Sequence, residues 1–201
     1  MAKTPFSYQA TEYDCVPVTF INALRHLFER KEIPPIVIQR IWQYSLDVIS
    51  KRGELGVGGT SGTAVDVIVK FLNSYREKGF AVKCDYLPES AEKDEQKYLN
   101  PKWNNDKRVS ILCVCMSNSK NKTHYVLGLG TDKNDSSQFL IFDPYKKTPP
   151  KDYENGANAQ VSVEKLNSED FLKYSMGPFY IKNKQNEDEA FREYVLLERI
   201  T

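Results

Sequence analysis

The sequence of 201 residues contains only two histidines, so there are few candidates for a general base. His124 follows the polar stretch SNSKNKT and begins the apolar run HYVLGLG. A histidine at the start of a strand, beside a loop, can be held firmly and still face a cleft. His26 lies inside a helical pattern next to Leu27, and we interpret it as a partly exposed helix residue. The sequence therefore favours His124 as the base.

Asp143 is the natural partner for this histidine. It ends the run FLIFDPY, 19 residues after His124. If the two apolar runs pair as a hairpin, the start of the first lies beside the end of the second. A carboxylate that accepts a hydrogen bond from one imidazole nitrogen fixes the ring, so the other nitrogen can take a proton from a nucleophile.

Cys15 is the candidate nucleophile because it stands at a predicted helix start. Asp14 occupies the position of an N-cap, and Pro17 falls in the first turn. The partial positive charge of a helix N-terminus favours a thiolate over a thiol. A lone cysteine is most often a small buried residue, but here it has partners. Gln9, six residues earlier, can donate to a developing oxyanion together with the Cys15 backbone N–H.

The apolar periodicity predicts a helical first half and a mainly antiparallel β second half. Helices are expected over 15–29, from Pro34-Pro35 through Ile49, over 63–78 and, short and charged, from Ser90 to before Pro101. Strands are expected over 80–86, 109–116, 124–130, 139–145 and 193–200, with a loop over 146–160. The fold class is thus α+β, a single domain over 1–201 with a helical subdomain of about 1–107 and a β subdomain of about 108–201.

Two further motifs are better explained without a ligand. The glycine-rich stretch GELGVGGTSG, 53–62, lacks the Lys-Ser/Thr ending of a phosphate-binding P-loop and follows a helix, so we expect a loop that needs positive φ angles or lines the cleft. Cys113 and Cys115 have no second Cys or His pair to complete a metal site, so we expect them to pack in a strand core. No cofactor and no metal is predicted.

The composition excludes several classes of partner. The net charge is +1, from 28 basic and 27 acidic residues, which gives no basic surface for nucleic acid. No stretch is apolar for the roughly 20 residues that span a bilayer, and no signal peptide is visible, although a removed leader would leave no trace. We expect four reduced thiols, a cytoplasmic location and no membrane insertion; the oligomeric state stays open.

Three segments together resemble the C39 and C39-like cysteine peptidases of the papain-like superfamily. They are YQATEYDCVPVTFINALRHLF with its Gln before an Asp-Cys pair, THYVLGLG with FLIFDPY, and the glycine-rich GTSGTAVDVIVKFL. The match covers about 6–28, 59–72 and 123–145. The resemblance implies a papain-like fold whose central helix starts at the nucleophile. It also implies that Gln9 is the oxyanion donor, Cys15 the nucleophile, His124 the base and Asp143 the orienting acid.

The function implied is a thiol-dependent hydrolase that cleaves a peptide or isopeptide bond in a peptide or protein substrate. Two alternatives stay open: an acyltransferase of transglutaminase-like chemistry, and a non-catalytic peptide-binding module. The chain departs from the family at Val16, where many members have glycine, and at Tyr145-Lys146-Lys147, where a glycine often follows shortly. Both departures concern the substrate more than the chemistry.

Overall fold

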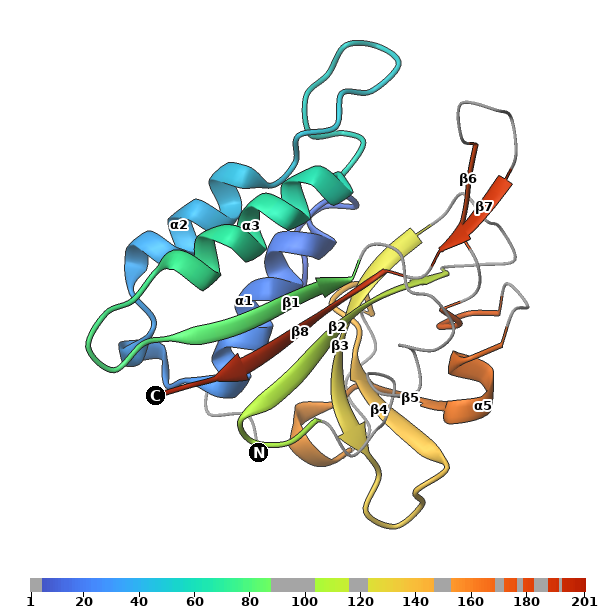
Figure 1. Ribbon diagram of the computed structural model, residues 1–201. Helices are drawn as coiled ribbons and strands as arrows, with labels where there is room; N and C mark the ends of the chain where they lie inside the picture. The colour runs from blue at the N-terminus through green and yellow to red at the C-terminus, as the bar shows by residue number, and fades with distance from the viewer. Residues whose placement is uncertain are drawn as a thin grey trace.

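The computed structural model describes residues 5–87, 104–115, 123–146, 153–168, 172–176, 179–182, 188–191 and 193–201. Within these ranges six strands form an antiparallel sheet in the order β1-β8-β2-β3-β4-β5 (Figure 1). The strands are β1 (Val82–Leu87), β2 (Arg108–Cys115), β3 (Thr123–Thr131), β4 (Gln138–Phe142), β5 (Ala159–Ser162) and β8 (Tyr194–Arg199). A separate hairpin pairs β6 (Phe179–Lys182) with β7 (Asp188–Phe191).

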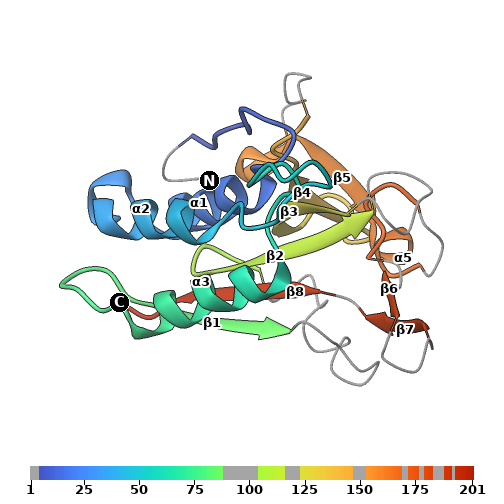
Figure 2. The same cartoon turned by 90° about the horizontal axis from the view of Figure 1, so that it is seen from above.

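Three helices lie together on one side of the sheet (Figure 1). They are α1 (Cys15–Leu27), α2 (Pro35–Tyr44) and α3 (Gly62–Ser74). Helix α1 packs against β2 and β3, α3 packs against β1, and α2 packs against the other two helices. Seen from above, α3 runs along β1 and α1 lies toward β3 (Figure 2). Short helical segments occur at Arg30–Glu32, Glu154–Gly156 and α5 (Val163–Leu166). The predicted α+β class is confirmed.

The sheet is buried on both faces, which explains the unbroken apolar run in β2. Val109, Ile111, Cys113 and Cys115 join the core beneath the helices, whereas the intervening Leu112 and Val114 join a second cluster on the opposite face. Successive side chains of a strand point to opposite faces, so a strand covered on both sides has no polar alternation. The predicted core packing of the two cysteines is confirmed.

The last strand, β8, lies inside the sheet and not at its edge. It pairs with β1 on one side and with β2 on the other. The sheet therefore includes β1 from the helical half of the chain.

The structure corrects three predicted boundaries. The second helix ends at Tyr44 and not at Ile49, and Leu46 has a left-handed φ of 58°. Helix α3 ends at Ser74, four residues before the predicted end, because a turn in which Gly79 has a φ of 86° intervenes. The chain leaves β4 at Phe142 and enters β5 at Ala159, inside the stretch predicted as a loop.

Two other predictions concern single residues or segments. His26 is 3% exposed, contrary to the expected partial exposure, and its Nε2 lies 3.1 Å from the Asn105 carbonyl oxygen. The charged helix predicted from Ser90 lies outside the described residues.

Candidate active site

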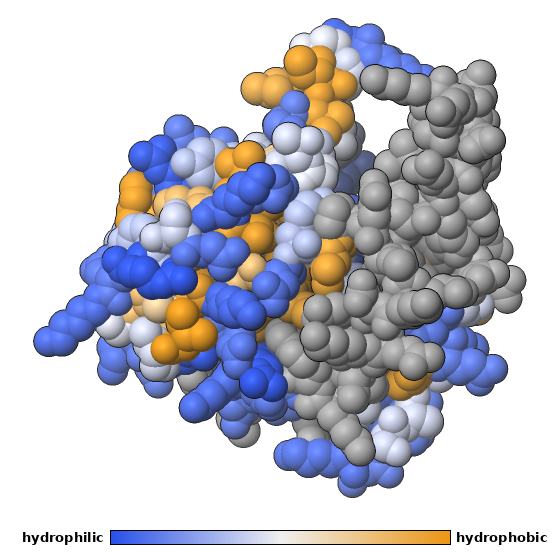
Figure 3. Space-filling model, viewed as in Figure 1, coloured by the Kyte–Doolittle hydropathy of each residue, from blue (hydrophilic) through white to orange (hydrophobic). Residues whose placement is uncertain are grey.

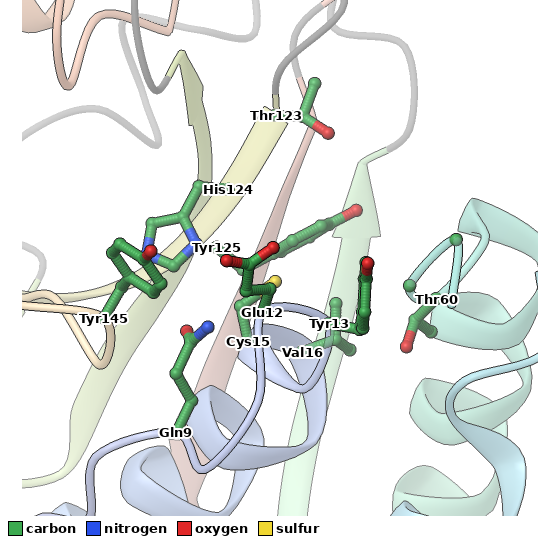
Figure 4. Close-up of a pocket in the computed structure, with 12 residues that line it drawn as sticks. Gln9, Glu12, Tyr13, Cys15, Val16, Thr60, Thr123, His124, Tyr125 and Tyr145 are labelled. Atoms are coloured by element: carbon green, nitrogen blue, oxygen red, sulfur yellow. The ribbon is translucent and has the colours of Figure 1, made fainter. Parts of the chain in front are cut away.

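Cys15 is the first residue of α1, as predicted, and its side chain is partly exposed. The first N–H groups of a helix have no acceptor within the helix, and its N-terminus carries partial positive charge. The thiol therefore lies beside unpaired donors in an electropositive place. Figure 4 shows Cys15, Gln9 and His124 gathered around one pocket.

Asp14 does not cap α1 with its side chain, contrary to the prediction. Its carboxylate instead accepts hydrogen bonds from the backbone N–H of Ala10 and Thr11, each at 3.0 Å, and from the Thr11 hydroxyl at 2.8 Å. Asp14 is 2% exposed. The preceding loop supplies donors closer to this carboxylate than the helix does, so Asp14 fixes the segment that connects Gln9 to Cys15.

Gln9 is held at both its backbone and its side chain. Its backbone N–H donates to the Pro144 carbonyl oxygen at 3.0 Å, and its Nε2 donates to the Thr11 carbonyl oxygen at 2.7 Å. A primary amide has two N–H donors, so one remains for another acceptor. The amide end is directed toward Cys15 (Figure 4).

His124 and Asp143 meet as the hairpin pattern predicted. The Nε2 atom of His124 lies 2.8 Å from Oδ1 of Asp143. Strand β4 ends at Phe142, opposite Leu127 of β3. Asp143 therefore leaves the sheet next to the start of β3, which pairs there with β2 but not with β4. The side chains of His124 and Asp143 are 5% and 3% exposed.

The electrostatics of this pair favour a charged imidazolium. Burial alone would lower the pKa of His124, but hydrogen bonds and charge from Asp143 and Cys15 raise its pKa to about 9. Burial alone would raise the pKa of Asp143, but the hydrogen bond and charge of His124 lower it overall. With Nε2 engaged by Asp143, Nδ1 is the nitrogen left for the Cys15 thiol.

Asp143 is supported by groups that sequence patterns did not indicate. The Tyr174 hydroxyl donates to Oδ2 at 2.6 Å, and the Tyr145 backbone N–H donates to Oδ1 at 2.9 Å. The side chain of Asn158 binds both the backbone N–H and the carbonyl oxygen of Asp143, at 2.7 and 2.8 Å. These contacts hold the carboxylate ionised and aligned.

The pocket above the thiol has a volume of about 470 Å³. Its lining comes from the segment before α1 (Gln9, Glu12, Tyr13), from α1 (Cys15, Val16), from the loop Gly58, Gly59 and Thr60, from β3 (Thr123, His124, Tyr125), and from Tyr145. Three tyrosines and two glycines, Gly58 and Gly59, form much of its wall.

The glycine-rich stretch has both predicted properties. Gly53, Gly56 and Gly59 have positive φ angles, and Gly58 and Gly59 line the pocket. The base of the loop is closed by Asp47, whose carboxylate accepts from the Ser61 backbone N–H at 2.8 Å and from the Ser61 hydroxyl at 2.5 Å. The loop projects from the molecule, and apolar colour appears on it in Figure 3. Ile49 and Leu55 on this loop are 62% and 70% exposed.

The two departures from the family pattern have clear places. Val16 is 1% exposed, belongs to the core between the helices and the sheet, and also lines the pocket. Tyr145 stands beside the histidine, with ring centroids 6.3 Å apart and planes at 73°. It therefore forms a wall over His124.

Among the residues that the structure describes, no group of three or more His, Cys, Asp or Glu side chains could hold a metal ion. In the same part of the chain, no helix is both long and apolar enough to cross a membrane.

No family model matches the chain, and no curated protein matches it either.

Proposed function

We propose that the protein is a thiol-dependent hydrolase of the papain-like, C39-like type that cleaves a peptide or isopeptide bond. One observation carries the proposal: His124 lines one pocket with Cys15, and its Nε2 lies 2.8 Å from the Asp143 carboxylate, which leaves Nδ1 for the thiol. A helix that begins at the cysteine and an antiparallel sheet that carries the histidine support the family interpretation.

The reaction begins when His124 takes the proton of the Cys15 thiol. The sulfur attacks the substrate carbonyl carbon, and the C=O π electrons move to oxygen. The second N–H of the Gln9 amide and the Cys15 backbone N–H stabilise this oxyanion. His124 then donates its proton to the leaving nitrogen as the C–N bond breaks, which leaves a thioester on Cys15.

Water completes the cycle. His124, now neutral, takes a proton from a water molecule, whose oxygen attacks the thioester carbonyl. The C–S bond breaks, the acid product leaves, and the proton returns to the sulfur. Asp143 stays ionised throughout, because its task is to orient the ring and to stabilise the imidazolium.

Selective alkylation tests the proposed ion pair. The protein is treated with sub-stoichiometric iodoacetamide at about pH 6, where an ordinary thiol with a pKa of about 8.5 is almost wholly protonated, and the modified cysteine is mapped by mass spectrometry. Cys84, Cys113 and Cys115 are internal controls, since they are buried and burial raises the pKa of each.

We expect iodoacetamide to modify Cys15 at a rate well above that of glutathione. In His124→Ala the rate at Cys15 should fall to about that of glutathione. Equal labelling of all four thiols, or a Cys15 that reacts no faster than glutathione, would contradict the proposal. A second measurement addresses the acyl-enzyme: a short-lived acyl adduct on Cys15 after mixing with p-nitrophenyl acetate, absent in Cys15→Ala.

A further inference from the structure

Apart from the Cys15 thiol and the tyrosines, the titratable groups of the pocket lining are the His124 imidazole and one carboxylate. The carboxylate is that of Glu12, and neither lysine nor arginine lines the pocket in the part of the chain that the structure describes. Figure 4 shows the Glu12 carboxylate among the side chains that line the pocket, which include Cys15. The His124 imidazolium is engaged by Asp143 and, in the proposed ion pair, by the Cys15 thiolate, so the Glu12 carboxylate adds a further negative charge at this pocket.

Within the part of the chain that the structure describes, no contact explains the placement of Glu12. It is exposed, and no hydrogen bond or ion pair joins it to another described residue. Asp14, two residues later, shows the contrast, because it is buried and holds the loop. The hydrogen bonds to Asp14 fix the backbone on both sides of Glu12, so the carboxylate is kept at the mouth of the pocket.

The neighbouring aromatic residues fit a cation as well. Tyr13, Tyr125 and Tyr145 line the same pocket as Glu12. Tyr13 and Tyr145 are 36% and 40% exposed, so their rings can be reached by a ligand. An ammonium or guanidinium group binds both to a carboxylate and to the face of an aromatic ring.

We propose that Glu12 is a specificity-determining residue that binds a positively charged side chain of the substrate, next to the carbonyl group that Cys15 attacks. The inference rests on the proposed function, since it names the class of substrate for the same site. The substrate is a peptide with lysine or arginine beside the scissile bond.

Charged alkylating reagents test the inference without a known substrate. Second-order rates at Cys15 are measured for 2-bromoethylamine, which is cationic, for iodoacetate, which is anionic, and for neutral iodoacetamide, each divided by the rate with glutathione. The test variant is Glu12→Gln. The control is Glu164→Gln, which also removes one exposed carboxylate but lies outside the pocket.

We expect the ratio of cationic to neutral rates to fall on the order of fivefold in Glu12→Gln, as for one charge pair about 4 Å apart in water. The ratio stays the same in Glu164→Gln. Added salt lowers the ratio in the wild type and has little effect in Glu12→Gln, because it screens the same charge. Peptidyl fluoromethyl ketones with arginine or norleucine at the terminal position extend the comparison to peptides, and the arginine compound should lose its advantage in Glu12→Gln.

The outcomes separate the two proposals. If iodoacetamide labels Cys15 selectively but the ratio is equal in wild type and Glu12→Gln, the inference about Glu12 is overturned and the proposed hydrolase stands. If Cys15 is not activated toward any reagent, the proposed function fails and the inference fails with it.

Discussion

The backbone N–H of Gln9 donates to the carbonyl oxygen of Pro144 across 3.0 Å. This hydrogen bond joins the segment before the nucleophile to the turn that follows Asp143. The contact thus links the proposed oxyanion donor to the carboxylate on His124, although the two lie in distant parts of the chain. Substitution of the Gln9 side chain leaves this backbone contact in place, so the amide can be tested by itself.

Gln9→Ala should separate attack by the thiolate from stabilisation of the oxyanion. Alkylation by iodoacetamide forms no oxyanion, so its rate at Cys15 should stay within about twofold of wild type. Acylation by p-nitrophenyl acetate does form one, and loss of a single donor lowers such rates by about 10²–10³-fold. Both rates are measured on the same preparation. Equal losses in the two reactions would show that Gln9 acts on the thiol or on the loop.

The titration of His124 reports directly on the pair with Asp143. The chain has only two histidines, so the ring signals in an NMR titration are readily assigned, with His26 as the internal reference. Because hydrogen bonds and charge from Asp143 and Cys15 outweigh burial, the pKa of His124 is raised to about 9. In Asp143→Asn the charge is lost and burial remains, so the pKa should fall well below 9. An unchanged pKa in this variant would show that Asp143 does not set the charge of the ring.

The raised pKa also predicts a pH dependence of stability. Between the unfolded pKa of about 6.5 and the folded value of about 9, the native state holds a proton that the unfolded state releases. The stabilisation from His124 is therefore full below about pH 6.5 and is lost as the pH rises through about 9; it amounts to about 3 kcal/mol. In urea unfolding, the difference between wild type and His124→Gln should shrink from pH 6 to pH 9.5. If the difference in unfolding free energy between the two proteins grows with pH, the prediction is wrong.

Tyr174→Phe removes one donor from Asp143. The hydroxyl lies 2.6 Å from Oδ2, and the tyrosine is 8% exposed. A hydrogen bond to a charged group contributes about 1.5–3 kcal/mol, so we expect a loss of this size in the free energy of unfolding and a rise in the pKa of Asp143. Tyr44→Phe is the control, because no described hydrogen bond uses that hydroxyl and its partly buried ring packs against the core. Equal stability losses in both variants would show that the Tyr174 hydroxyl contributes nothing specific.

The parts of the site that the sequence predicted are those that depend on local pattern. His124 and Asp143 stand at the ends of two apolar runs, and hairpin pairing alone brings such ends together. Cys15 was found from helix-start signals. The end of the second helix was less well predicted, because the apolar pattern continues past Leu46. There the backbone leaves the helix, and the Leu46 N–H donates to the Thr60 hydroxyl at 3.0 Å.

The supporting residues could not be predicted because their partners are distant in sequence and follow no period. Tyr174 lies 31 residues from Asp143, and Asn158 lies 15 residues away in an irregular segment. Asp14 shows another limit. An acidic residue before a helix fits an N-cap, yet the same side chain can bind the loop before it, and only the three-dimensional positions of Ala10 and Thr11 decide between them.

The wall of the pocket depends on a close approach that only glycine allows. A Cβ atom at Gly58 would lie 2.3 Å from Cγ1 and 2.9 Å from Cβ of Val48, across the base of the glycine-rich loop. Gly58→Ala should therefore push the loop away from Val48, lower the free energy of unfolding by about 1–3 kcal/mol and change the alkylation rate at Cys15 by bulky reagents more than by iodoacetamide. Val48→Ala removes the clashing methyl groups, so the double variant Gly58→Ala/Val48→Ala should recover part of the loss. Stability from urea unfolding and rates at Cys15 for the four proteins form a double-mutant cycle. Additive effects in that cycle would show that the two residues do not meet and that the loop is built differently.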